Sequence, residues 1–139
     1  GTKVLFTHAD VPVNAGTAST IRVFAKQYRE HMRGDSESLG GTQNKYGDKT
    51  VVRGRTIFRN RGFSEMRPED IDQMVANLGV DYLVVGHTPH LGITPYSLKV
   101  FDIDVGMTPR YGENEPAALV FKKEGVYGFY SKSGEQKLR

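Results

Sequence analysis

The strongest constraint on the fold is a short apolar run at 82–86, which stops at the sequence Gly86-His87-Thr88-Pro89. The run is rich in β-forming residues and predicts a buried strand. In layered α/β folds, ligands bind at the carboxyl ends of the strands, because loops there vary while the sheet holds them rigid. We therefore predict that His87 faces a metal ion or a substrate.

A second strand is predicted to end in the same way. Lys3 to Phe6 is short and apolar, and the sequence Thr7-His8-Ala9-Asp10 follows it. Neutral imidazole nitrogens suit zinc, manganese, iron or nickel, so two such strand ends placed side by side would present two nitrogens to one ion. The alternative for each histidine is a structural bond to a loop carbonyl. His90, three residues beyond His87, is a further polar group expected at the rim.

The other expected elements complete an α/β pattern. Helical spacing of apolar residues predicts helices over 17–33 and from Pro68 to Gly79, and a glycine-rich loop over 34–62 separates them. A strand over 98–105 and a hairpin of 117–121 with 126–130 follow. The order predicts one domain with a mixed sheet and helices on one face.

Basic and hydroxyl side chains offer candidate phosphate ligands. Five arginines fall within fifteen residues around the glycine-rich loop: Arg53, Arg55, Arg59, Arg61 and Arg67. The guanidinium group clamps phosphate in a bidentate way, although a solvated basic loop explains most of the five equally well. Tyr111 lies in a polar loop, where its hydroxyl would bond a phosphate oxygen or its ring would simply pack.

Composition excludes several classes of protein. The chain has 139 residues and a net charge of +3, which is too small to argue for a nucleic-acid partner. It has no cysteine, so disulfides and thiolate-bound zinc are excluded. No apolar run approaches the roughly 20 residues of a membrane span, and we expect no membrane partner. The compartment stays open, with the cytoplasm favoured.

Four segments of the chain resemble one enzyme family, and their order along the chain agrees with that family. The segments 5–10 and 84–89 are similar to the two late histidine motifs of calcineurin-like metallophosphoesterases, in the phosphoprotein phosphatase branch. The sequence 102–107, followed by Tyr111-Gly112, resembles the next strand and loop of the bacterial, Shewanella-like phosphatases. Asn60-Arg61-Gly62-Phe63 resembles the segment that carries the phosphate-binding arginine of that family.

The resemblance implies a role for individual residues. His8 and His87 would be ligands of the second ion of a dinuclear site that holds two divalent metal ions (Mn, Fe, Zn or Ni). Arg61 would hold the substrate phosphate, with Tyr111 near it. His90 is not carried over as a ligand, because residue 89 is proline, as in that branch. The implied reaction is attack of a metal-bridging hydroxide on phosphorus in a phosphomonoester or phosphoprotein.

The resemblance also implies that part of the enzyme is missing. The family motifs Asp-x-His, Gly-Asp-x-x-Asp-Arg-Gly and Gly-Asn-His do not occur in the sequence. Residues 1–139 are therefore expected to be the C-terminal half of a four-layer αββα sandwich, inactive alone, which pairs with the other half or with itself. One alternative is a non-catalytic binding or regulatory module that uses its arginine-rich loop for an anionic partner. The other is a small α/β domain whose histidines are structural.

Overall fold

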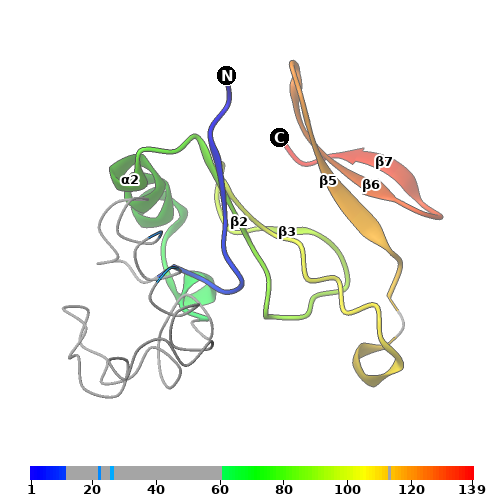
Figure 1. Cartoon of the computed structure of the whole chain (residues 1–139). Coiled ribbons are helices and arrows are strands. Elements are labelled where there is room, and N and C mark those ends of the chain that lie inside the picture. Colours follow the sequence, from blue (N-terminus) through cyan, green and yellow to red (C-terminus); the bar gives the residue numbers. More distant parts are fainter. Residues whose placement is uncertain (12–21, 23–25, 27–60, 113) are drawn as a thin grey trace, which may run out of the picture.

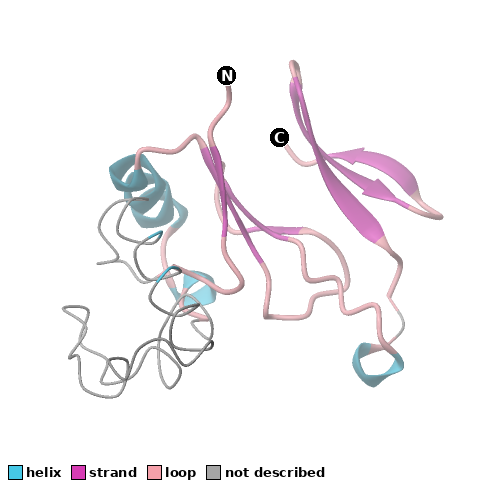
Figure 2. Cartoon of the chain, viewed as in Figure 1, coloured by secondary structure: helices cyan, strands magenta, loops and turns pink. Residues whose placement is uncertain are grey.

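A computed structural model describes residues 1–11, 22, 26, 61–112 and 114–139 (Figures 1 and 2). Its central sheet has four strands in the order β1-β2-β4-β3, with bounds β1 Val4–Phe6, β2 Tyr82–Val85, β4 Val100–Asp102 and β3 Thr94–Pro95. β1, β2 and β4 run parallel, and β3 pairs antiparallel with β4. The carboxyl ends of the three parallel strands therefore meet at one edge of the sheet.

Helix α2, Pro68–Leu78, forms where the sequence predicts it. Proline in the first turn costs no hydrogen bond there, and Glu69 and Asp70 complement the positive end of the helix dipole. Gly79 ends the helix in the left-handed conformation, with φ 71°. The helix buries the apolar stripe Ile71, Met74, Val75 and Leu78.

A second, antiparallel sheet follows in the chain. Its strands are β5 Ala117–Lys122, β6 Gly125–Tyr130 and β7 Gly134–Lys137, in that order across the sheet. β5 and β6 form the predicted hairpin, with Lys122 opposite Gly125 at its turn. β7 was not predicted.

The central sheet buries both of its faces, which gives three layers. On β2, Leu83 and Val85 belong to the apolar cluster formed with α2, whereas Tyr82 packs with the cluster on the opposite face. On β4, Phe101 joins that second cluster together with Val126 of β6. Figure 1 shows the resulting order of α2, the central sheet and the antiparallel sheet.

The described part of the chain thus has an α/β fold with one mixed and one antiparallel sheet. The predicted strand over 98–105 is shorter, because the chain leaves the sheet after Asp102 and turns. The helix expected over 17–33 and the loop expected over 34–62 lie almost entirely outside the described residues. Within the described ranges, no helix has the length and apolar character needed to span a bilayer.

Candidate functional site

The parallel register of β1 and β2 brings His8 and His87 together. Phe6 is paired with Val84, and the alignment continues past the strands, where the Gly86 N–H donates to the His8 carbonyl at 3.1 Å. The two imidazoles are in contact, with His8 Nε2 3.0 Å from His87 Nδ1. The sequence thus located both histidines, while the register that joins them comes from the fold; their role as metal ligands stays a prediction.

The backbone at His87 has an unusual conformation. Its φ is 73°, and it is the one described residue other than glycine with a positive φ. A non-glycine residue in this region costs of order 1 kcal/mol or more, and such strain persists only where the surroundings hold it, often at functional sites.

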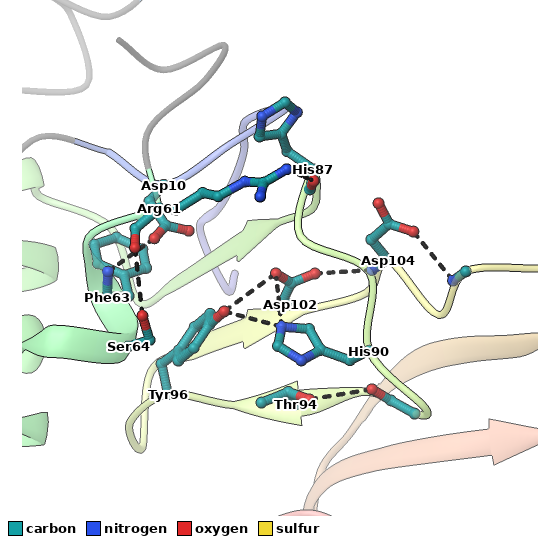
Figure 3. Close-up of polar contacts among 12 residues, drawn as sticks. Asp10, Arg61, Phe63, Ser64, His87, His90, Thr94, Tyr96, Asp102 and Asp104 are labelled. Atoms are coloured by element: carbon teal, nitrogen blue, oxygen red, sulfur yellow. Dashed lines mark hydrogen bonds and ion pairs between the residues drawn. The ribbon is translucent and has the colours of Figure 1, made fainter. Parts of the chain in front are cut away.

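Arg61 lies beside the histidine pair. Its Nη2 reaches the carbonyl oxygen of His87 at 3.5 Å, a long and weak bond that Figure 3 shows along the extended side chain. The arginine is exposed, so it places a cation at the rim of the site. Arg67 differs, because it forms a two-point ion pair with Asp70 at the start of α2. Arg53, Arg55 and Arg59 lie outside the described residues.

Tyr111 lies on a neighbouring loop. It ends the short 3-10 helix η3, Pro109–Tyr111, and is half exposed. Asn114 ties this loop to the His87 segment, because its Nδ2 donates to the carbonyls of both His90 and Tyr111 at 3.3 Å. The loop is also tightly packed: an added Cβ on Gly106 would lie 3.0 Å from the Tyr111 Cβ. Phosphate binding by Tyr111 stays a prediction.

Asp10 is a buried carboxyl that the sequence reasoning did not single out. Its side chain is fully buried, and Oδ2 accepts the Phe63 N–H at 2.8 Å (Figure 3). This bond connects the segment of His8 to η2, Phe63–Glu65, which directly follows Arg61 and Gly62. Oδ1 has no partner among the described residues. Burial raises the pKa of Asp10 to about 6, because the charged form loses its hydration.

A second buried carboxyl, Asp102, organises the residues beneath the site. Its Oδ2 lies 3.5 Å from both the Tyr96 hydroxyl and His90 Nε2, and the latter two are 3.0 Å apart. Burial raises the pKa of Asp102, and it also raises the pKa of Tyr96. His90 was expected at the rim, but it is partly buried and turned toward Asp102 (Figure 3). Its position three residues after His87 indicated that it lies near the strand end, but not the direction in which its side chain points.

The histidine pair fits part of a metal site. Zinc–nitrogen bonds are about 2.0–2.1 Å long, so two nitrogens 3.0 Å apart can share one ion at an angle of about 90°. No group of three or more histidine, aspartate, glutamate or cysteine side chains with metal-ligand geometry occurs among the described residues. His8 and His87 therefore suit two positions around an ion, and any further ligands would have to lie outside the described residues.

Comparison with known proteins gives matches only at the level of structure. No family model matches the sequence, and no curated protein matches it. A cold-active protein tyrosine phosphatase is similar over 99% of this chain and 40% of its own, with a TM-score of 0.76 and 16% identity. The cold-active protein-tyrosine phosphatase of a psychrophilic Shewanella species gives a TM-score of 0.77 at 17% identity, with 99% and 41% coverage. A point mutant of a cold-active protein tyrosine phosphatase gives 0.74 at 17% identity, also with 99% and 41% coverage.

This similarity establishes the fold. At 16–17% identity it does not carry substrate or cofactor to this chain. The chain has a phosphatase-like fold and spans about 40% of the length of these phosphatases.

Proposed function

We propose that this chain is the C-terminal part of a metal-dependent phosphoesterase of the calcineurin-like family. The observation that carries the proposal is the 3.0 Å approach of His8 Nε2 to His87 Nδ1 at the ends of two parallel strands. The likeness to phosphatase structures over 99% of the chain supports it. The substrate class is a phosphomonoester, on a protein or a small molecule.

The residues of this chain would bind the ion and the phosphate. The two imidazoles each offer a neutral nitrogen to one divalent ion, and manganese, iron, zinc and nickel all accept such ligands. Arg61 would pair with the phosphate oxygens, with Tyr111 as a second contact from the neighbouring loop. When bound, divalent ions lower the pKa of water toward neutrality and neutralise charge that develops on the phosphate.

The remaining ligands would come from a part of the protein that this chain does not contain. β1 lies at an edge of the central sheet in the described fold, and its Phe6 is 65% exposed. Exposed apolar side chains on an edge strand favour pairing with another segment. We propose that the other half of a four-layer αββα sandwich covers this region, with self-association as the alternative when that half is absent.

Metal binding by the purified chain tests the proposal. We expect weak Zn²⁺ or Mn²⁺ binding by calorimetry, because two nitrogens are an incomplete ligand set. His8→Ala and His87→Ala should each abolish it, whereas His31→Ala, the matched change at a histidine outside the two strand ends, should not. Equal binding by all three variants would contradict the assignment.

An activity assay separates the metal site from the completeness of the enzyme. We expect no turnover of p-nitrophenyl phosphate by the 139-residue chain with Mn²⁺ alone. Turnover by the chain would show that it holds all the catalytic groups, and would refute the missing half. The alternative of a non-catalytic module that binds an anionic partner is not favoured, because the structural neighbours are phosphatases.

A further inference from the structure

We propose that the buried cluster of Asp102, His90 and Tyr96 is a positioning device that holds His87 against His8. We call these three residues the positioning cluster. The proposal rests on the proposed function in one respect, namely that the His8–His87 pair binds a metal ion. The role of the cluster in holding the metal-free pair stands independently of that function.

The cluster fixes the far end of the loop that carries His87. His90 is held at three points: its N–H donates to the Asp104 carbonyl at 2.8 Å, and its carbonyl accepts from Asn114. Its Nε2 lies 3.0 Å from the Tyr96 hydroxyl and 3.5 Å from Asp102. The backbone and the side chain of His90 are thus both attached to the β4 region.

Asp102 also forms the turn to which His90 is attached. Its Oδ1 accepts the Asp104 N–H at 2.8 Å, and Asp104 Oδ1 in turn accepts the Gly106 N–H at 3.1 Å (Figure 3). This turn presents the Asp104 carbonyl to the His90 N–H. Asp102 therefore acts on His90 twice, directly through Oδ2 and indirectly through the turn that Oδ1 stabilises.

The near end of the loop is fixed by a different contact. Gly86 donates to the His8 carbonyl at 3.1 Å, directly after β2. Only Thr88 and Pro89 separate His87 from His90, so both ends of a very short segment are anchored. A left-handed φ of 73° at His87 requires such anchoring, because the conformation is unfavourable by itself. Release of His90 should let His87 relax and move its ring away from His8.

The experiment compares two single hydroxyl deletions in otherwise intact tyrosines. Tyr96→Phe removes the hydroxyl that contacts His90 and Asp102. Tyr130→Phe, the matched control, removes a hydroxyl that accepts the buried Ile93 N–H at 3.0 Å. Tyr130 packs in the cluster on the other face of the sheet, and its hydroxyl holds Ile93, which lies beyond His90, and does not contact His90 itself. Loss of that hydroxyl should lower stability without moving His87. His90→Gln is the second test variant and keeps a polar side chain.

The first measurement uses the metal-free chain at one fixed pH. Imidazole ¹⁵N chemical shifts report the hydrogen bond between His8 Nε2 and His87 Nδ1. We expect the wild type and Tyr130→Phe to show the shifts of a bonded pair, and Tyr96→Phe and His90→Gln to lose them. The second measurement is a Zn²⁺ titration, in which the two test variants should bind about tenfold more weakly or worse.

The outcomes separate the two proposals. Folded test variants with wild-type imidazole shifts would overturn the positioning role, and so would an equal change in Tyr130→Phe. If the wild type binds no Zn²⁺ but the test variants show the expected changes in imidazole ¹⁵N shifts, the metal-site function is overturned and the positioning role is supported. Because Tyr96→Phe keeps the aromatic ring, it gives the answer even if His90→Gln unfolds.

Discussion

The buried carboxyl of Asp10 should make a contribution to stability that falls as the pH rises from about 4 to about 6. Burial raises its pKa from the ordinary 3.8 to about 6, so the folded chain retains a proton that the unfolded chain loses. The contribution of Asp10 to the free energy of unfolding is therefore fully present below pH 3.8 and is lost as the pH rises until the folded carboxyl has ionised. A shift of about two units corresponds to an upper limit of about 3 kcal/mol. Nearby solvent screens the charge of the ionised carboxyl even though its own surface is covered, and we expect about 1–2 kcal/mol.

Asp10→Asn tests this directly, because the amide keeps an acceptor for the Phe63 N–H but does not titrate. Urea unfolding at several pH values from about 4 to about 7 should give a flatter profile for the variant than for the wild type. Asp72→Asn, the same change at a partly exposed position on α2, is the control. Hydrogen bonds lower the pKa of Asp70 and Glu115, whose contributions to stability rise with pH, whereas burial raises the pKa of Asp102, whose contribution falls. All three residues are present in every variant, so the difference between the profiles reports Asp10. Parallel profiles for wild type and Asp10→Asn would refute the reasoning.

Three further predictions concern the packing of the chain. In urea titrations, Gly106→Ala should lower the free energy of unfolding by more than Gly79→Ala does. Both glycines have a positive φ, but only a Cβ at Gly106 would meet neighbouring side chains. Equal losses in the two variants would contradict this crowding at Gly106. Ile71→Ala should cost about 2–5 kcal/mol in the same assay, since the side chain is fully buried, and a loss below about 1 kcal/mol would count against the α2 interface. A double-mutant cycle on Lys122 and Glu135 should give a small coupling that weakens with salt, as for other partly exposed pairs; a coupling unchanged by salt would show that the pair is shielded from solvent.

Local patterns in the sequence were sufficient for the elements that carry the candidate ligands. β1 and β2 are short apolar runs ended by polar residues, and α2 has both a helical stripe and clear end signals. Each pattern is confined to a short segment and is matched by burial in the fold, so local and tertiary preferences agree. The prediction that His8 and His87 are paired depended only on both strands being neighbours in one sheet.

Other features depend on contacts that no local pattern records. β7 consists of Gly-Glu-Gln-Lys and has no apolar alternation; it forms because β6 offers it a pairing edge. β3 has only two residues, one of them proline, and exists through its register with β4. Asp102 and Tyr96 are separated from His87 by turns whose geometry decides which side chains meet. The inward direction of the His90 side chain follows from that geometry. Because no local pattern in the sequence shows it, we predicted His90 at the rim.

The site residues of this chain are held by contacts that require no metal ion. His8 follows β1 and is tied through Asp10 to the segment after Arg61, while His87 is held between Gly86 and His90. Such support reduces the conformational freedom that metal binding would otherwise have to remove, and a supported ligand set binds more tightly than a loose one. A part of the protein that supplied the remaining ligands would therefore meet two nitrogens already in place. The proton between His8 Nε2 and His87 Nδ1 must leave before both nitrogens bind one ion. Apart from that step, the added ligands, and not a large displacement of His8 and His87, should account for the gain in metal affinity when the site is completed.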